Sequence, residues 1–160
     1  MILVWCMLVL SAGTEEIPLE RAEQSSIYGS WAADRAIDND TSTVAVTNKE
    51  SNPWLKIYFK SSADVEKVMI EKGHSYDKSC VFAVSVYKGE VKKLCGTYHN
   101  KWGYYNNEAV QCGGKRGDSV VVEVTECGKH LYINELKVYG QGKQGRTFGI
   151  DDSYRQSISS

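Results

Sequence analysis

Short stretches rich in β-branched and aromatic residues recur along this chain and restrict what it can fold into. In several of them apolar and polar residues alternate, as Phe82, Val84 and Val86 show. A period of two is typical of a strand with one buried face. The stretches are Leu55–Phe59, Val65–Lys72, Cys80–Tyr87, Ser119–Thr125 and Leu131–Tyr139. Turn residues separate them and no long segment has helical periodicity, so the sequence predicts an all-β, antiparallel β-sandwich.

The two ends of the chain differ in composition from this central part. Residues 1–13 are almost wholly apolar and end in Ser11-Ala12-Gly13, which predicts a secretory signal peptide cleaved near Gly13. The run lacks a Lys or Arg at its start, so an N-terminal anchor is the alternative. Residues 141–160 are polar, rich in Gly and Ser and without a period, and we expect a disordered tail. The folded domain is therefore expected over residues 17–140.

Charge and motif content exclude several functional classes. The formal net charge of -1 argues against capture of nucleic acid or anionic lipid by electrostatics. The three histidines, His74, His99 and His130, have no zinc-type spacing, and the chain lacks a phosphate loop and a nucleophile elbow. We therefore expect a protein that binds rather than an enzyme.

Cysteine usage agrees with an oxidising compartment. Removal of a signal peptide would leave Cys80, Cys95, Cys112 and Cys127. Four cysteines allow three pairings, of which we favour Cys95–Cys112 with Cys80–Cys127. Buried free thiols are the alternative.

Two acidic residues in one loop suggest a metal site. Asp38 and Asp40 stand two positions apart in a loop-rich region, and the distant Glu135 can add a third carboxylate. Calcium takes about six to eight oxygen ligands from carboxylates and carbonyls. The helix–loop–helix calcium motif does not fit, because Lys49 stands where that loop requires a bidentate Glu. The alternative is that both aspartates only form Asx turns.

Several motifs together resemble the F-type lectin (fucolectin) family, within the discoidin-like, coagulation-factor C-type group. They are Gln24-Ser25-Ser26, Ala36-Ile37-Asp38, Asn52-Pro53-Trp54, Val110-Gln111-Cys112 and Asn134–Gly140. The resemblance covers roughly residues 17–140. It implies a β-jelly-roll sandwich with a calcium ion under the loops at one end. The implied calcium ligands are the carbonyls of Arg35 and Asn134, with Asp38, Asp40, Thr43 and Glu135.

The fucose-binding positions of the family depart from its pattern here. Fucolectins hold fucose through one His and two Arg, and these positions fall on Val46, Lys72 and Lys78. Valine cannot hydrogen-bond a hydroxyl, and lysine lacks the planar fork of arginine. His74, in the same loop as Lys72, is a candidate replacement for the imidazole. Tyr28 and Trp31 lie in a loop that the resemblance places beside the pocket, where aromatic faces suit the apolar face of a sugar.

Together these observations predict a secreted, noncatalytic, calcium-stabilised carbohydrate-binding module with a degenerate fucose motif and a glycan as its partner. The alternative is a discoidin-like module that has lost sugar binding and binds a cell-surface protein or lipid. Its contacts would come from the aromatic cluster Trp102, Tyr104 and Tyr105, or from the integrin-type tetrapeptide Arg116–Ser119. A third possibility is a structural domain that uses residues 141–160 as a linker. The oligomeric state stays open.

Overall fold

A computed structural model describes residues 13–73, 80–99, 106–125 and 128–142. The elements are β1 (Glu15–Glu16), β2 (Leu19–Gln24), a 3₁₀ turn η1 (Ala33–Ala36), β3 (Ala45–Val46), β4 (Trp54–Gly73), β5 (Val81–Lys88), β6 (Val91–His99), β7 (Asn106–Thr125), β8 (Tyr132–Ile133) and β9 (Glu135–Gln141). All strand pairs are antiparallel. The predicted all-β, antiparallel sandwich is confirmed.

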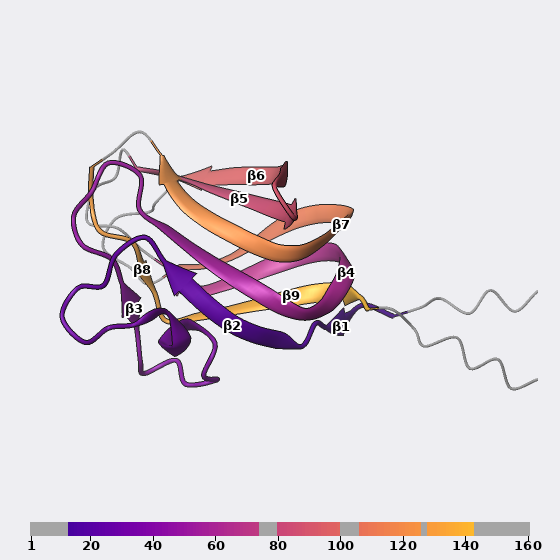
Figure 1. The fold of residues 1–160 in the computed structure, drawn as a ribbon, viewed down its shortest axis with the longest axis horizontal. Coiled ribbons are helices and arrows are strands. Elements are labelled where there is room, and N and C mark those ends of the chain that lie inside the picture. The colour runs from indigo at the N-terminus through magenta and orange to yellow at the C-terminus, as the bar shows by residue number, and fades with distance from the viewer. Residues whose placement is uncertain (1–12, 74–79, 100–105, 126–127, 143–160) are drawn as a thin grey trace, which may run out of the picture.

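Two long, bent strands, β4 and β7, connect the layers of the sandwich (Figure 1). The first part of β4, residues 54–59, pairs with β2 and with residues 119–123 of β7. Its second part, residues 63–73, pairs with β9 and with residues 106–117 of β7. The register shifts between the two parts. Strands β5 and β6 extend the first layer, and β1 extends the second beyond β9.

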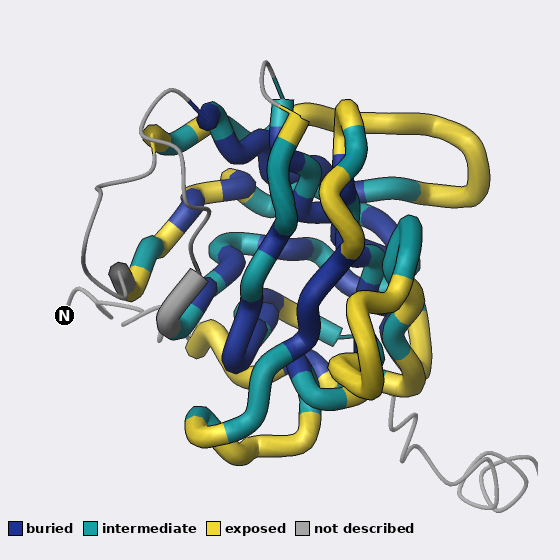
Figure 2. The backbone as a smooth tube through the Cα atoms, turned by 90° about the vertical axis from the view of Figure 1, so that its left-hand side faces the viewer, coloured by how far each residue is buried: buried dark blue, intermediate teal, exposed yellow. Residues whose placement is uncertain are grey.

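The core lies between the layers and follows the alternation seen in the sequence. Leu55, Ile57 and Phe59 are buried along β4, and Phe82 and Val84 are buried along β5. Figure 2 views the end of the sandwich that carries η1, β3 and β8, where exposed loops surround buried strands. Within the described residues, no helix has the length and apolar character needed to cross a lipid bilayer.

Some elements differ from expectation. No strand was predicted before residue 55, but residues 15–16 and 19–24 form β1 and β2, which pair with β9 and β4. Only Leu19 and Ala22 of β2 pack against the core, so an edge strand with few apolar residues escaped the pattern. The two stretches expected as separate strands at 55–59 and 65–72 form one continuous strand, β4.

The disulfide predicted between Cys95 and Cys112 is confirmed, with the two Cα atoms 4.5 Å apart. It ties the edge strand β6 to β7. Cys80 is also disulfide-bonded. Its predicted partner, Cys127, lies outside the described residues, as do the residues of the predicted signal peptide up to position 12 and those of the predicted tail from position 143 on.

Candidate functional site

A two-stranded sheet organises the loop end of the sandwich. In it β3 pairs with β8, with Ala45 opposite Ile133 and Val46 opposite Tyr132. The chain before β3 carries the loop with Asp38 and Thr43, and the residues after β8 are Asn134 and Glu135. One small scaffold therefore joins the acidic loop to the start of β9.

Oxygen atoms converge around the hydroxyl of Thr43. Its Oγ1 lies 2.7 Å from Asp38 Oδ2, 3.0 Å from the Asp40 carbonyl oxygen and 3.2 Å from the Arg35 carbonyl oxygen. A hydroxyl has one proton and can donate only one full hydrogen bond. At least two of these contacts therefore bring oxygen lone pairs together without a proton between them, an arrangement that a cation would stabilise.

The acidic loop also has the Asx turns expected of such residues. The Asp40 main-chain N–H donates to Asp38 Oδ1 at 2.9 Å, and the Ser42 N–H donates to Asp40 Oδ1 at 2.8 Å. The Asp40 carboxylate therefore faces Ser42, while the Asp40 carbonyl faces Thr43. Asn39, between them, adopts the left-handed conformation with φ of 62°. The Asx turns and the oxygen cluster therefore exist together in one loop, where the Asp40 carbonyl also accepts from the Thr43 N–H at 3.1 Å.

Glu135 is the buried carboxylate of the site. Its side chain is 2% exposed, and its Oε2 has no hydrogen-bond partner among the described residues. Burial, with the neighbouring carboxylate of Asp38, raises the pKa of Glu135 to about 7, and a hydrogen bond from the Asn39 main chain partly offsets this rise. A buried carboxylate without a full set of partners is costly. Its position beside Asp38 is the second observation that fits a bound cation.

Asn134 holds the loop against β9 in a role that the sequence did not reveal. Its Nδ2 donates to the carbonyl oxygens of Thr41, at 3.0 Å, and Thr43, at 2.7 Å. The resemblance assigns only the Asn134 main-chain carbonyl to the metal. The side-chain amide fixes the distance between the acidic loop and Glu135.

Within the described residues, no group of three or more His, Cys, Asp or Glu side chains is placed to hold a metal ion. Carboxylates alone therefore do not make this site. The available donors are two neighbouring carboxylates, a hydroxyl and main-chain carbonyls, which is a mixture that calcium accepts.

Two exposed aromatic residues precede η1 in the chain and form part of a second surface. Tyr28 is 46% exposed and Trp31 is 37% exposed, with ring centroids 5.6 Å apart. The ring of His130 meets Tyr28 edge-on at 5.2 Å, and Tyr132 lies 5.8 Å from His130. We call these four residues the aromatic surface. His130 and Tyr132 were not predicted, because only the fold brings them to Tyr28.

Hydrogen bonds fix the loop that carries this surface. Val46 accepts from the Tyr28 N–H at 2.9 Å and donates to the Trp31 carbonyl at 3.0 Å. Gln24 Nε2 contacts the carbonyl oxygens of Val46, at 2.9 Å, and Trp31, at 3.2 Å. His130 Nδ1 lies 2.7 Å from the Thr47 carbonyl oxygen. Because a carbonyl only accepts, Nδ1 carries the proton, and Nε2 of a neutral ring is then an acceptor.

The remaining predicted sugar contacts are not brought together by the described residues. The Val46 side chain is 0% exposed, so it offers no surface to a ligand; its main chain instead holds the loop. Lys72 lies in β4, but its side chain is outside the described residues. His74 and Lys78 also lie outside them.

The tetrapeptide Arg116–Ser119 is built into β7 rather than carried on a loop tip. Arg116 pairs with Asp64 at 2.9 Å, and Asp118 accepts from the Gly89 N–H at 3.0 Å. A Cβ on Gly117 would lie 2.3 Å from Val86 Cγ1, so the strands approach closely there. The exposed, mobile tip that integrin recognition needs is therefore absent at this position. The other alternative surface, Trp102, Tyr104 and Tyr105, lies outside the described residues.

Comparison with solved structures identifies the fold. The striped bass (Morone saxatilis) serum fucolectin matches with a TM-score of 0.65 and 20% identity, over 76% of this chain and 45% of that one. A family 32 carbohydrate-binding module (CBM32) from Clostridium perfringens NanJ, solved with galactose, matches with a TM-score of 0.68 and 17% identity, over 79% and 98%. The lectin domain of lectinolysin, solved with Lewis B antigen, matches with a TM-score of 0.64 and 25% identity, over 77% and 94%.

The sequence matches no family model and no curated protein. This chain spans less than half the length of the bass fucolectin but nearly all of the other two structures. The expected resemblance is confirmed at the level of fold: the chain has the β-sandwich shared by F-type lectins and discoidin-like CBM32 modules.

Proposed function

We propose that this protein is a secreted, noncatalytic carbohydrate-binding module that recognises a glycan with its loop end. The structures that share its fold are lectins and carbohydrate-binding modules, among them ones solved with galactose and Lewis B antigen. The observation that carries the proposal is the exposed pair Tyr28 and Trp31 on a loop held by main-chain hydrogen bonds.

The aromatic surface supplies the chemistry of sugar recognition. The exposed faces of Tyr28 and Trp31 can stack on the apolar C–H face of a pyranose. His130 Nε2, an acceptor in the neutral ring, would take a hydrogen bond from a sugar hydroxyl. Because the loop is already ordered, binding pays little for immobilising it.

The ligand preference should differ from that of a fucose-specific lectin. The position of the family's histidine is a buried valine, Val46, and the arginine positions are lysines, Lys72 and Lys78. The loss of an imidazole and two guanidinium forks removes directional donors. In this proposal Lys72, His74 and Lys78 remain candidate contacts at the rim, while stacking and His130 carry more of the affinity.

The proposal includes a structural calcium ion. The carbonyls of Arg35 and Asn134, with Asp38, Asp40, Thr43 and Glu135, would hold it. The convergent oxygens at Thr43 and the unpartnered Oε2 of Glu135 support this assignment. The ion would neutralise the buried carboxylate of Glu135 together with the exposed carboxylate of Asp38. It would also fix the chain between η1 and β3, which in turn positions the aromatic surface.

Secretion is part of the proposal and is supported by the covalent chemistry. The disulfide Cys95–Cys112 and the bonded Cys80 suit an oxidising compartment. The apolar residues 1–13 would direct the export.

A glycan array probed with the oxidised protein, with calcium or with excess EDTA, tests the function. Binding of the wild-type protein to a defined sugar class, with weaker binding by Trp31→Ala, supports the proposal. A blank array with wild-type protein in calcium would overturn the glycan assignment and turn attention to protein or lipid partners. A calcium-dependent rise in the melting temperature tests the metal separately.

A further inference from the structure

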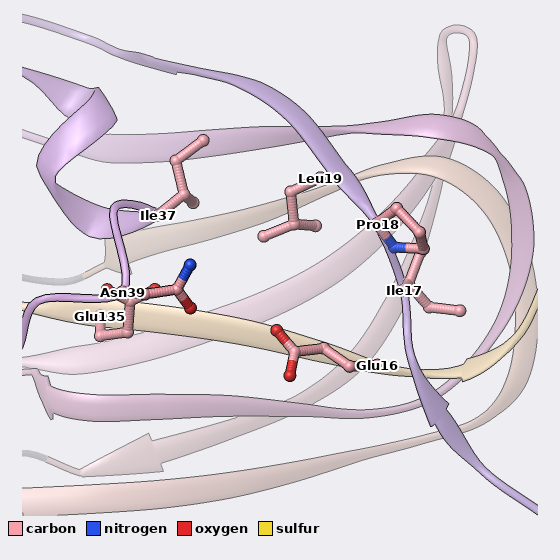
Figure 3. A pocket seen from close by; sticks show the side chains of 7 residues that line it. All are labelled: Glu16, Ile17, Pro18, Leu19, Ile37, Asn39 and Glu135. Atoms are coloured by element: carbon pink, nitrogen blue, oxygen red, sulfur yellow. The ribbon is translucent and has the colours of Figure 1, made fainter.

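The first strand of the domain closes a pocket beside the acidic loop. The pocket has a volume of about 230 Å³ and is lined by Glu16, Ile17, Pro18, Leu19, Ile37, Asn39 and Glu135. One wall is apolar and comes mainly from the start of the chain. The opposite wall holds Asn39 and Glu135, so the pocket borders the oxygen cluster described above (Figure 3).

The pocket contains carboxylate oxygens that the described residues do not satisfy. Glu135 is 2% exposed, and its Oε2 has no hydrogen-bond partner. The Glu16 carboxylate points across the pocket toward Asn39 and Glu135 in Figure 3. Glu16 is exposed, and within the described part of the chain its carboxylate forms no hydrogen bond or ion pair with another side chain. The carboxylates of Glu16 and Glu135 line the same pocket, and a cation held beside Glu135 would attract the Glu16 carboxylate.

Backbone pairing fixes the direction in which Glu16 points. Strand β1 pairs with β9, with Glu15 opposite Gly140 and Glu16 opposite Tyr139. Successive side chains of a strand point to opposite faces. Glu16 lines the pocket and Glu15 does not, and beyond the end of β1 residues 17–19 line it as well. The Ile17 N–H also donates to the Val138 carbonyl at 2.8 Å, which holds this segment on β9.

We propose that Glu16 is an outer carboxylate of the cation site, contributed by the N-terminal strand and acting on the ion through water. The inference rests on the calcium site in the proposed function. Glu16 is absent from the ligand set that the resemblance implies. The pocket has room for several waters, at about 30 Å³ of liquid volume each. Those waters would bridge Glu16 to the ion, as carboxylates outside the ligand shell commonly do.

This arrangement couples the N-terminal strand to the metal. The bound ion attracts Glu16 toward the pocket, so occupancy should also order residues 15–19. Conversely, removing the charge at Glu16 should weaken the metal without removing a ligand. At about 6 to 8 Å through water, with a dielectric constant of about 80, one charge acting on a divalent ion changes affinity about six- to tenfold.

The experiment is a calcium titration of the full chain by calorimetry, with terbium luminescence as a second readout. Glu16→Gln should weaken calcium binding about three- to tenfold, and Glu16→Lys should weaken it more. Glu15→Gln is the matched control, because it removes the same charge one residue away on the opposite face, and it should change affinity less than about twofold. Raising the ionic strength should shrink the difference between Glu16→Gln and wild type.

The outcomes separate this inference from the proposed metal site. Equal calcium affinities for wild type, Glu16→Gln and Glu15→Gln would overturn the role of Glu16 while the calcium site stands. An equal loss in both glutamine variants would also overturn it, since the effect would then be general charge. No calcium binding by the wild-type protein would overturn both. Calcium-dependent protection of the Leu19 and Glu20 amides from hydrogen exchange, reduced in Glu16→Gln, would support the coupling.

Discussion

The carboxylate of Asp38 lies close to that of Glu135. Burial of Glu135, together with this neighbouring charge, raises the pKa of Glu135 to about 7. The two residues are distant in the chain, and β8 and the Asn134 amide bring them together. The folded protein therefore holds a carboxyl group that is partly protonated near neutral pH unless a cation replaces the proton.

The first prediction is that stability without calcium falls as the pH rises. The ordinary pKa of Glu135 is 4.5, and folding raises it to about 7. Above pH 4.5 the unfolded chain releases this proton while the folded protein keeps it, so folding loses free energy until the pH passes about 7. Thermal melts in EDTA between pH 5 and pH 8 should show the fall, and saturating calcium should reduce it. Glu135→Gln should flatten the profile; parallel profiles for variant and wild type would contradict the assignment.

The second prediction concerns the hydroxyl at the centre of the oxygen cluster. Thr43→Val keeps the size of the side chain but removes Oγ1, which contacts Asp38 Oδ2 at 2.7 Å. We expect calcium affinity to fall at least about tenfold. Thr43→Ser keeps the hydroxyl and should stay within about threefold of wild type. Calorimetric titration measures both, and an unchanged affinity in Thr43→Val would remove Thr43 from the ligand set.

The third prediction concerns the aromatic surface. Trp31→Ala and Tyr28→Ala should each lower affinity for the best glycan about three- to tenfold, because each removes a stacking face. Tyr139→Ala is a control, since it removes an aromatic ring from β9 that is not part of the aromatic surface. Affinity is measured by calorimetry with the glycan that the array identifies. Equal effects of all three substitutions would argue against a specific stacking site.

The fourth prediction separates the two roles of His130. His130→Phe keeps an aromatic edge against Tyr28 but loses Nε2 and the contact of Nδ1 with Thr47 at 2.7 Å. Stability should fall by about 1 kcal/mol, the typical contribution of one hydrogen bond. His130→Phe should lower glycan affinity more than Tyr132→Phe does, because Tyr132→Phe keeps an aromatic ring near His130. Glycan affinity equal to wild type in His130→Phe would show that Nε2 contacts no sugar.

The fifth prediction tests the covalent tie between β6 and β7. The double variant Cys95→Ala/Cys112→Ala should lose about 3 kcal/mol of stability, as expected for a closed loop of this size, with a sequence separation of 17. Chemical denaturation measures the difference. Glycan binding should persist at low temperature, because the aromatic surface lies on the loop before η1, on β8 and on His130 just before β8. Loss of binding in a variant that remains folded would show a link between β6 and the loop end.

The sequence predicted the parts of this structure that depend on local pattern. Alternation at Phe82, Val84 and Val86 identified β5, and the resemblance indicated the loop in which Arg35, Asp38 and Thr43 meet. The sequence pattern did not predict β2, because only two residues of this strand pack against the core and they are separated by exposed residues such as Arg21.

The residue pattern of the sequence could not predict contacts between distant segments. His130 meets Thr47 across 83 positions, and nothing near either residue signals the other. The place of the tetrapeptide Arg116–Ser119 was likewise not predictable, because the close approach of Gly117 to Val86 depends on the pairing of β5 with β7.

The pairing of β1 with the end of β9 also determines how the domain can be attached to something else. Glu15 lies opposite Gly140, and both strands reach the side of the sandwich away from β3 and β8 (Figure 1). A tag, a surface linkage or a second copy joined to β1 or β9 would therefore leave the domain on the side opposite β3 and β8. The loops that we propose to bind glycan would stay uncovered. Tandem or immobilised copies could then engage several sugars at once, so a modest affinity per site would suffice for stable capture.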